Sequence, residues 1–364
     1  MKVALVHDYL VRLGGAERVL FSLRKIFPNA PIYTLIYDKN KLGKYLNNAK
    51  IVTSFLQNFP YILRKNYRAL LPFIPAAVET LDLSDFDLVI SSCSAFCKGI
   101  ILRAHATHIC YCHRPTGFLW DDTFTYNTRF NSIKKIFFHF LRLWDLSAAD
   151  RVDYFIANSN FTLKRIKKFY RKSAEVIYPP VQLGIFRPQE NHLQKSGYFL
   201  IVSQLTYYKR IDIAIEAFNK LELPLIIIGE GRERKKLQKM ANRNIKFLGF
   251  LEDEKVKEYY KNCIAFIFPG KDDFGISPVE AMSFGKPVLA FRGGGALEII
   301  LEGETGEFFD DLHPASLADG ARRILKNLKN YNPFIIRKRA EEFSEEKFIL
   351  NFKKFLSRIN INVH

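Results

Sequence analysis

Short apolar runs alternate with amphipathic segments along most of this chain. In the first half, four apolar runs end in polar or glycine-containing loops, which is typical of strands buried on both faces of a parallel sheet. We expect these strands within residues 3–6, 86–92, 108–115 and 153–159. His7, Asp8 and Tyr9 are expected to end the first of them.

The second half repeats this pattern. The predicted strands are residues 198–203, 225–228, 245–249 and 264–268, and the predicted helices are 211–221 and 232–242, with a further helix beginning at Ser277 or Pro278. Repeated strand-helix units indicate an α/β fold with a doubly wound parallel sheet in each half.

A change of composition separates the two halves. Pro179 and Pro180 lead into a polar stretch at residues 189–196, which is typical of a domain boundary. We therefore expect domains at residues 1–185 and 186–344. Ser344 can cap a last helix whose apolar face holds Phe348, Phe352 and Phe355.

The chain is strongly basic. Its 364 residues include 55 Lys and Arg against 37 Asp and Glu, a formal net charge of +18. Such a balance indicates a nucleic acid, an acidic membrane surface or a phosphorylated substrate as partner, and a solvated basic surface is the alternative. Five cysteines without paired spacing favour reduced thiols in a cytoplasm over a disulfide framework or a zinc site.

Two segments interleave aromatic and basic side chains. They are residues 55–81 and 129–144. This mixture is typical of a helix lying on an anionic bilayer, but a core helix with a solvated basic face gives much the same pattern. The sequence shows no signal peptide and no run long enough to span a membrane, so membrane contact is expected to be peripheral.

The stretch at residues 268–298 carries the most specific chemistry. Asp272 follows an apolar strand and Glu280 lies eight residues later, in the first turn of the next predicted helix. Both acids can therefore face the carboxyl edge of a parallel sheet, where such sheets bind ligands. Gly275 allows close approach of the backbone, and a helix N-terminus offers N–H groups to an anion or to sugar hydroxyls. The pattern favours a sugar-nucleotide site over surface acids.

Three further places have site-like chemistry. Gly14 and Gly15 follow the first strand and open a helix, as in an anion cradle or a tight structural turn. His113 ends an apolar strand, where it is either a catalytic group or a structural one. Lys209 and Arg210 stand where a strand meets a helix, so they can neutralise a diphosphate or form a solvated helix start.

Together these motifs resemble family 4 of the retaining glycosyltransferases, which have the GT-B fold. The resemblance rests on the GGAER sequence after the first strand, on His113, and on the stretch from Asp272 to Glu280 with Phe274-Gly275 and Pro-Val-Glu-Ala-Met. Within this family, the sequence most resembles bacterial mannosyltransferases of polysaccharide and O-antigen synthesis.

The resemblance implies two Rossmann-like domains facing a cleft, with residues 345–364 packing back on the first domain. It implies a metal-independent, retaining hexosyltransferase without a cofactor, which moves a sugar, here mannose from GDP-mannose, to a lipid-linked or saccharide acceptor. The enzyme would be cytoplasmic and peripheral at the inner face of the cytoplasmic membrane. An anionic membrane surface is then an expected partner, and nucleic acid is not.

The resemblance also implies residue roles. His113, Lys209, Asp272 and Glu280 would serve catalysis, with Lys209 on the leaving diphosphate. The residues expected to bind the donor are Gly14, Gly15, Gln204, Lys209, Arg210, Asp272, Phe274, Gly275, Ile276 and Glu280. The residues expected to bind the acceptor are Arg114, Trp120 and Asp121.

Three positions depart from the family pattern. Asp272 replaces a Glu, Gln204 replaces an Arg, and Gly117 stands where an Arg is usual, with Arg114 as a possible substitute. These departures keep open a UDP-sugar donor or a non-catalytic sugar-nucleotide-binding protein. The alternative from another class is a nucleic-acid-binding protein, although its basic residues would be spread along the chain without a recognisable reading motif.

Overall fold

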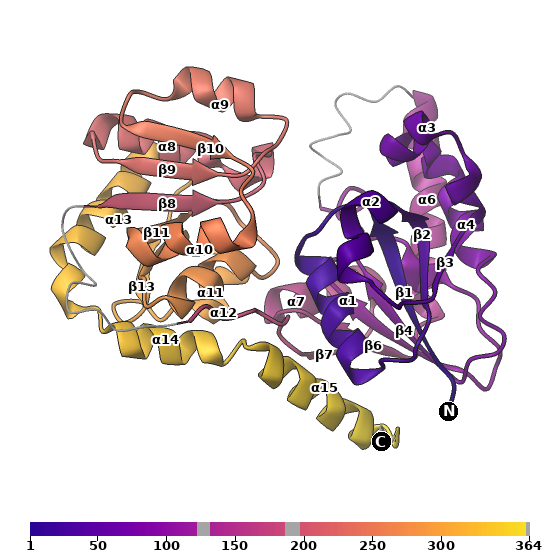
Figure 1. Ribbon diagram of the computed structural model, residues 1–364. Helices are drawn as coiled ribbons and strands as arrows, with labels where there is room; N and C mark the ends of the chain where they lie inside the picture. Colours follow the sequence, from indigo (N-terminus) through magenta and orange to yellow (C-terminus); the bar gives the residue numbers. More distant parts are fainter. Residues whose placement is uncertain (122–131, 186–196, 362–364) are drawn as a thin grey trace. The chain divides into compact units, whose positions relative to one another are not determined.

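The computed structural model describes residues 1–121, 132–185 and 197–361. These residues form two compact units (Figure 1). The first comprises Met1–Pro180 and Phe348–His364, and the second comprises Val181–Lys347. The units therefore divide directly after the double proline, five residues before the predicted boundary at 185, and the polar stretch at 189–196 lies outside the described residues.

A seven-stranded parallel sheet forms the centre of the first unit. Its strand order is β3-β2-β1-β4-β5-β6-β7. The strands are β1 (Val3–Leu10), β2 (Ile32–Tyr37), β3 (Ile51–Thr53), β4 (Leu88–Cys93), β5 (Thr107–Cys112), β6 (Tyr154–Ala157) and β7 (Ala174–Val176). The helices described here are α1 (Gly15–Ile26), α2 (Lys39–Leu42), α3 (Tyr61–Lys65), α4 (Ile74–Glu79), α6 (Ser132–Asp150), α7 (Asn160–Tyr170) and, beginning at the end of the second unit, α15 (Glu345–Arg358). Short 3-10 helices are η1 (Gly43–Tyr45), η2 (Phe55–Asn58), η3 (Tyr67–Phe73) and η4 (Cys97–Gly99).

The second unit has a six-stranded parallel sheet of order β10-β9-β8-β11-β12-β13. Its strands are β8 (Tyr198–Val202), β9 (Leu225–Ile228), β10 (Ile245–Gly249), β11 (Cys263–Phe268), β12 (Val288–Phe291) and β13 (Gly306–Phe309). Its helices are α8 (Ile211–Leu221), α9 (Arg234–Met240), α10 (Asp253–Asn262), α11 (Ile276–Ser283), α12 (Ala296–Ile299), α13 (Pro314–Lys326) and α14 (Pro333–Glu341), with 3-10 helices η5 (Tyr207–Lys209) and η6 (Leu328–Asn330). The predicted doubly wound parallel sheet in each half is confirmed.

The prediction that His7, Asp8 and Tyr9 end the first strand is wrong. Strand β1 continues to Leu10, and it pairs with β4 as far as His7 and with β2 as far as Leu10. The polar side chains of His7 and Asp8 are 2% and 3% exposed, because buried partners satisfy their hydrogen bonds. The predicted helix at 232–242 is also too long, since α9 covers only Arg234–Met240.

The last helix belongs to the core of the first unit. Helix α15 begins after Ser344, whose side chain accepts a hydrogen bond from the N–H of Lys347 at 3.3 Å. Its apolar face is buried against the sheet, where the ring of Phe348 lies 5.8 Å from that of Tyr111. This contact joins residues that are more than two hundred positions apart in the sequence.

The two aromatic and basic segments form helices that pack on the first sheet, and those of the first segment are short. Residues 55–81 form η2, α3, η3 and α4, and residues 132–144 belong to α6, while 129–131 lie outside the described residues. Both segments contribute to the same apolar cluster, through Leu70 and Ile74 and through Leu141. Among the described helices, none combines the length and apolar character needed to cross a bilayer.

We expect Phe352→Ala to destabilise the first unit. The side chain of Phe352 is fully buried, and removing such a ring costs about 3–5 kcal/mol through lost burial and the cavity left behind. Leu350→Ala on the same helix is the control, because Leu350 is 46% exposed and should cost less than about 0.5 kcal/mol. Urea unfolding monitored by fluorescence measures both variants. Equal stabilities would contradict the packing of α15 described above.

Candidate functional site

In both units the predicted site residues follow the strands at which the strand order reverses or, from His113 to Asp121, the next strand of the sheet, β5. In the first unit this point lies between β1 and β4, and in the second between β8 and β11. Open parallel sheets bind ligands at such points, because the loops on either side turn away from each other. Gly14 follows β1, Lys209 follows β8 and Asp272 follows β11.

Lys209 and Asp272 form a direct ion pair. The Nζ atom of Lys209 contacts Oδ2 of Asp272, and both side chains are less than 20% exposed. Burial alone would lower the pKa of Lys209, but the Asp272 carboxylate outweighs burial and raises it. The ammonium group also lies 5.4 Å and 6.0 Å from the ring centres of Tyr208 and Phe268. Lys209 is therefore held charged beside the loop after β11.

Glycines allow the loops around this ion pair to meet. A Cβ atom on Gly270 would lie 2.8 Å from the Cα atom of Lys209, so only a glycine fits there. The N–H of Gly295 donates to the carbonyl of Asp272 at 3.0 Å. Gly294 has a φ of +65°, and a Cβ there would lie 2.2 Å from the same carbonyl oxygen. The loops after β8, β11 and β12 are thus tied together at Asp272.

Helix α11 presents its N-terminus beside this loop. Gly275 precedes the helix with a φ of +113°, and no side chain caps the helix, which begins at Ile276. The Phe274 ring is only 3% exposed and packs 5.5 Å from Phe343, so it serves the core rather than a ligand. On α11 itself, Oε2 of Glu280 accepts a hydrogen bond from the hydroxyl of Tyr260 at 3.0 Å.

Two further residues that we expect to bind the sugar donor, Gln204 and Arg210, lie after β8. Gln204 is exposed, in the loop that leads to η5. Arg210 adopts a left-handed backbone conformation, with a φ of +50°, at the start of α8. Two of its guanidinium nitrogens contact the Asp212 carboxylate at 3.3 Å. The charge of Arg210 is therefore paired with that of Asp212.

In the first unit, His113 is held from several sides. Its N–H donates to the carbonyl of Cys93 at 2.8 Å, and its carbonyl accepts a hydrogen bond from the side chain of Asn158 at 2.9 Å. Its ring atom Nε2 lies 2.8 Å from Oγ of Ser92. Burial and the charge of His7 lower the pKa of His113 to about 3. The ring is therefore neutral at physiological pH.

The Gly14-Gly15 turn starts α1 beside an acid of the same helix. Gly14 is the N-cap of α1, and a Cβ there would approach a carboxylate oxygen of Glu17 at 3.0 Å. The other carboxylate oxygen of Glu17 lies 3.5 Å from Nε2 of His7. The turn therefore places backbone N–H groups next to a buried acid-histidine pair.

A buried ion pair supports the loop of residues 113–121. Oδ1 of Asp145 on α6 accepts hydrogen bonds from Nζ of Lys98 at 2.5 Å and from the hydroxyl of Thr116 at 2.7 Å. Oδ2 of Asp145 accepts from the indole N–H of Trp120 at 2.8 Å and from the hydroxyl of Tyr170 at 3.0 Å. Lys98 and Asp145 are almost fully buried, so both charges depend on this network. The indole N–H of Trp120 is directed into the network.

The side chain of Arg114 fills the space next to Gly117. A Cβ on Gly117 would lie 2.4 Å from both Cζ and Nε of Arg114, so the guanidinium occupies the position of a side chain at 117. The family pattern has its arginine at that position, and here Arg114 reaches it from three residues earlier. Asp121, the third predicted acceptor residue, forms an ion pair with Arg165 on α7.

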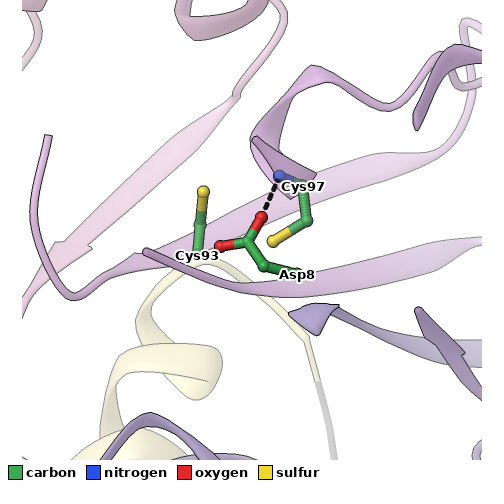
Figure 2. A group of neighbouring side chains, drawn as sticks. All are labelled: Asp8, Cys93 and Cys97. Carbon is green, nitrogen blue, oxygen red and sulfur yellow. Dashed lines mark hydrogen bonds between the residues drawn. The ribbon is translucent and has the colours of Figure 1, made fainter. Parts of the chain in front are cut away.

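Asp8 lies in a group of residue types that often bind metals, with Cys93 and Cys97 (Figure 2). Its carboxylate, however, accepts four backbone hydrogen bonds, at 2.6–2.9 Å, from the N–H groups of residues 94–97. These donors use the lone pairs that a cation would need. The Asp8 side chain therefore holds the loop after β4 against the end of β1 through these hydrogen bonds.

Sequence reasoning missed the polar residues behind the site. They are His7, Asp8, Glu17, Ser92, Lys98 and Asp145, all less than 10% exposed. The available signal was the presence of charged or polar residues inside apolar segments, since such residues are rarely buried without partners.

Two family models match this chain. The model described as "Glycosyltransferase Family 4" matches residues 13–184, and the one described as "Glycosyl transferases group 1" matches residues 184–342. The two matches meet at residue 184, close to the division between the two compact units.

Similar proteins cover nearly the whole chain. An uncharacterized glycosyltransferase of Methanocaldococcus jannaschii is 24% identical over 99% of this chain and 99% of its own. The alpha-1,3/1,6-mannosyltransferase of Dictyostelium discoideum is 24% identical over 99% of this chain and 97% of its own. The yeast enzyme of the same name, from Saccharomyces cerevisiae, is 26% identical over 98% of this chain and 84% of its own.

Solved structures share the fold at lower identity. The Anabaena protein HepE in complex with UDP-glucose has a TM-score of 0.73 and 19% identity, over 98% of this chain and all of that one. Sucrose-phosphate synthase from Thermosynechococcus elongatus has a TM-score of 0.76 and 15% identity, over 98% of this chain and 99% of that one. With both halves matched in order and the two parallel sheets in place, the chain belongs to family 4 of the glycosyltransferases and has the GT-B fold.

Proposed function

We propose that this protein is a retaining, metal-independent hexosyltransferase that moves mannose from GDP-mannose to a lipid-linked or polysaccharide acceptor in cell-surface glycan synthesis. The observation that carries the proposal is the half-buried Lys209 ammonium after β8, held beside the N-terminus of α11 and the Asp272 loop. A fixed positive charge there can stabilise the diphosphate that leaves when the glycosidic bond to the nucleotide breaks. Relatives with mannosyltransferase names over nearly the whole chain support mannose.

The residues divide into three tasks under this proposal. Lys209, with Arg210 or Gln204, stabilises the leaving diphosphate, and Glu280 holds the ribose. Asp272 and the backbone of residues 274–276 hold the transferred sugar. In the first unit, His113 contacts a substrate sugar, and Gly14 and Gly15 supply backbone N–H groups. No step requires a metal ion, because Lys209 supplies the positive charge.

A uridine-sugar donor is the second candidate. HepE has been solved with UDP and with UDP-glucose, and it shares the fold of this chain. Asp272 and Gln204, which replace the family's Glu and Arg, leave room for an altered donor. Melting temperatures measured with GDP, GDP-mannose, UDP and UDP-glucose separate the two, since a ligand that binds only the native state raises the melting temperature more, the further its concentration exceeds its Kd. Stabilisation by uridine ligands alone would exclude GDP-mannose.

The first unit offers a surface for an anionic membrane. Helix α3 has no buried residue, and on it Ile62 is 79% exposed. On α6, Ile136, Phe140 and Leu143 are at least 50% exposed, while Leu141 and Asp145 are buried. The outward face of α6 is thus apolar as well as basic, unlike the solvated basic face of an ordinary core helix. The exposed basic residues of these segments are Lys65, Arg68, Lys134 and Lys135.

We expect Lys209→Ala to weaken binding of the donor nucleotide at least tenfold, because a charge-assisted contact to a phosphate contributes about 1.5–3 kcal/mol. Asp272→Asn should act differently. It removes the acid that neutralises Lys209, so affinity for the free nucleoside diphosphate is maintained or rises while sugar transfer falls. Calorimetric titration and a transfer assay measure these effects, with the exposed Lys220→Ala on α8 as the charge-matched control. Unchanged donor affinity in Lys209→Ala would contradict the assignment.

Arg114 and Gly117 can be tested as one functional unit. Gly117→Ala should displace the Arg114 guanidinium and lower transfer about as much as Arg114→Ala, since the added Cβ occupies its space. The double variant should be no worse than Arg114→Ala alone, because both changes remove the same group. Arg114→Ala combined with Gly117→Arg should recover part of the activity. Additive losses in kcat/KM, without recovery, would show that the two positions act separately.

Binding to vesicles tests the membrane surface. We expect Phe140→Ser to reduce affinity for phosphatidylglycerol vesicles about tenfold or more, because burying a phenyl ring contributes about 1.5–3 kcal/mol. Phe250→Ser is the matched control, since Phe250 is 75% exposed on the second unit. Phosphatidylcholine vesicles should bind more weakly, and added salt should weaken binding to the anionic ones. Equal effects of the two substitutions would place the contact elsewhere.

A further inference from the structure

A chain of buried polar side chains runs behind His113. Glu17 on α1 contacts Nε2 of His7 on β1 at 3.5 Å. The other ring nitrogen of His7, Nδ1, lies 3.2 Å from Oγ of Ser92 on β4. The same Ser92 oxygen lies 2.8 Å from Nε2 of His113, which follows β5. The four side chains come from four different elements. They meet because β1, β4 and β5 are neighbours in the sheet.

Burial makes the proton positions in this chain interdependent. Ser92 is fully buried, His7 is 2% exposed and Glu17 is 8% exposed. A buried hydroxyl has one proton to donate, so it donates to one histidine and accepts from the other. The direction of donation at Ser92 therefore fixes which nitrogen of His113 carries the proton.

The charge of His7 sets that direction. When His7 is protonated, both of its nitrogens donate, one to Glu17 and one to Ser92. The hydroxyl of Ser92 then donates to Nε2 of His113, and the His113 proton must be on Nδ1. When His7 is neutral, the Glu17 carboxylate keeps the proton on Nε2 of His7, so Nδ1 accepts from Ser92 and the chain reverses. The His113 proton is then on Nε2.

We propose that Glu17 and His7, acting through Ser92, hold His113 in the tautomer with its proton on Nδ1, so that this nitrogen donates a hydrogen bond to the bound substrate. The inference deepens the proposed function and rests on it for the identity of that substrate. Among the residues that the structure describes, Nδ1 of His113 has no hydrogen-bond partner, which leaves it for an oxygen acceptor such as a sugar hydroxyl. Glu17, His7 and Ser92 are positioning residues in this arrangement.

The surroundings of His7 favour its protonated form. Burial alone would lower the pKa of His7, but the hydrogen bond and charge of Glu17 outweigh burial and raise it. Asp8, next along β1, and Cys93 on β4 act in the same direction. For Glu17, burial would raise the pKa, but His7 outweighs burial and lowers it. The positive charge of His7 in turn lowers the pKa of His113, so His7 carries the positive charge and His113 stays neutral.

Nitrogen NMR of the histidine rings tests the tautomer directly. The protein is labelled with 15N-histidine, and long-range proton–nitrogen correlations distinguish a protonated ring nitrogen from an unprotonated one. The His113 pattern is assigned among the eight histidines as the one lost in His113→Gln. We expect a protonated Nδ1 and an unprotonated Nε2 at neutral pH. A protonated Nε2 would overturn the proposal.

Two variants and a matched control test the role of the chain. Glu17→Gln removes the acid that charges His7. Where the amide oxygen of the variant accepts from Nε2 of the neutral His7 ring, Ser92 donates to Nδ1 of His7 and the His113 proton moves to Nε2, whereas an amide N–H that donates to Nε2 of His7 keeps the original tautomer. Ser92→Ala removes the link, so the His113 tautomer should no longer respond to position 17. Ser91→Ala is the control, because Ser91 is also fully buried on β4 and its hydroxyl lies 2.8 Å from a different histidine, His108. The control should leave the His113 pattern unchanged.

The outcomes separate this inference from the proposed function. The tautomer is measured without any substrate, so this test of the inference does not depend on whether the protein binds a sugar donor. An unchanged His113 pattern in Ser92→Ala would overturn the role of these buried side chains, because that variant removes the hydroxyl that donates to Nε2 of His113. A transfer assay on the same variants then tests the donor role of Nδ1. Ser92→Ala should lose transfer while Ser91→Ala keeps it, and equal activity in Ser92→Ala and the parent protein would overturn that role.

Discussion

The reversal of strand order beside β1 and beside β8 is the constraint on which the two units depend. On either side of each reversal, successive strands are added in opposite directions, so the loops after β1 and β4, and those after β8 and β11, turn away from each other. Every predicted catalytic residue lies on a loop or helix that follows one of these strands or the next strand of the sheet. The chemistry is therefore located by topology, and the individual side chains decide what that location binds.

Buried charge gives these loops their shape. Asp8 and the Lys98–Asp145 pair would each cost several kcal/mol to bury alone, because a charge loses its hydration in the interior. Asp8 offsets this cost with four backbone N–H donors, and Asp145 with one ammonium and three neutral donors. Each acid thereby fixes a loop next to the predicted site. Their polar partners lie on different elements, so these bonds form only in the folded state.

The sequence predicted those parts that local pattern determines. The apolar runs at residues 225–228 and 245–249 became β9 and β10 with the expected bounds, and the helix 211–221 became α8. The end of β1 was misplaced because polarity was taken to end the strand, whereas the partners that bury His7 and Asp8 come from β4 and from the loop after it. The same limit explains why Ser92 and Asp145 were missed. A polar residue inside an apolar segment indicates that a buried partner exists, but the local pattern does not identify a partner that lies far away in the sequence.

In the second unit, acid partners, among them Asp272, which departs from the family pattern, affect how the cations after β8 can bind a diphosphate. Both cations after β8 already have an acid partner, Lys209 in Asp272 and Arg210 in Asp212. A diphosphate that binds there must exchange with a carboxylate, so its net gain is smaller than at an unpaired cation. The main-chain carbonyl of Asp272 accepts a hydrogen bond from the N–H of Gly295, so the loop after β12 helps to hold Asp272 in place. If a donor binds at Lys209 as proposed, it must displace the side chain of Asp272, which lies in the loop expected to hold the sugar, so recognition of the nucleotide would be linked to placement of the transferred group.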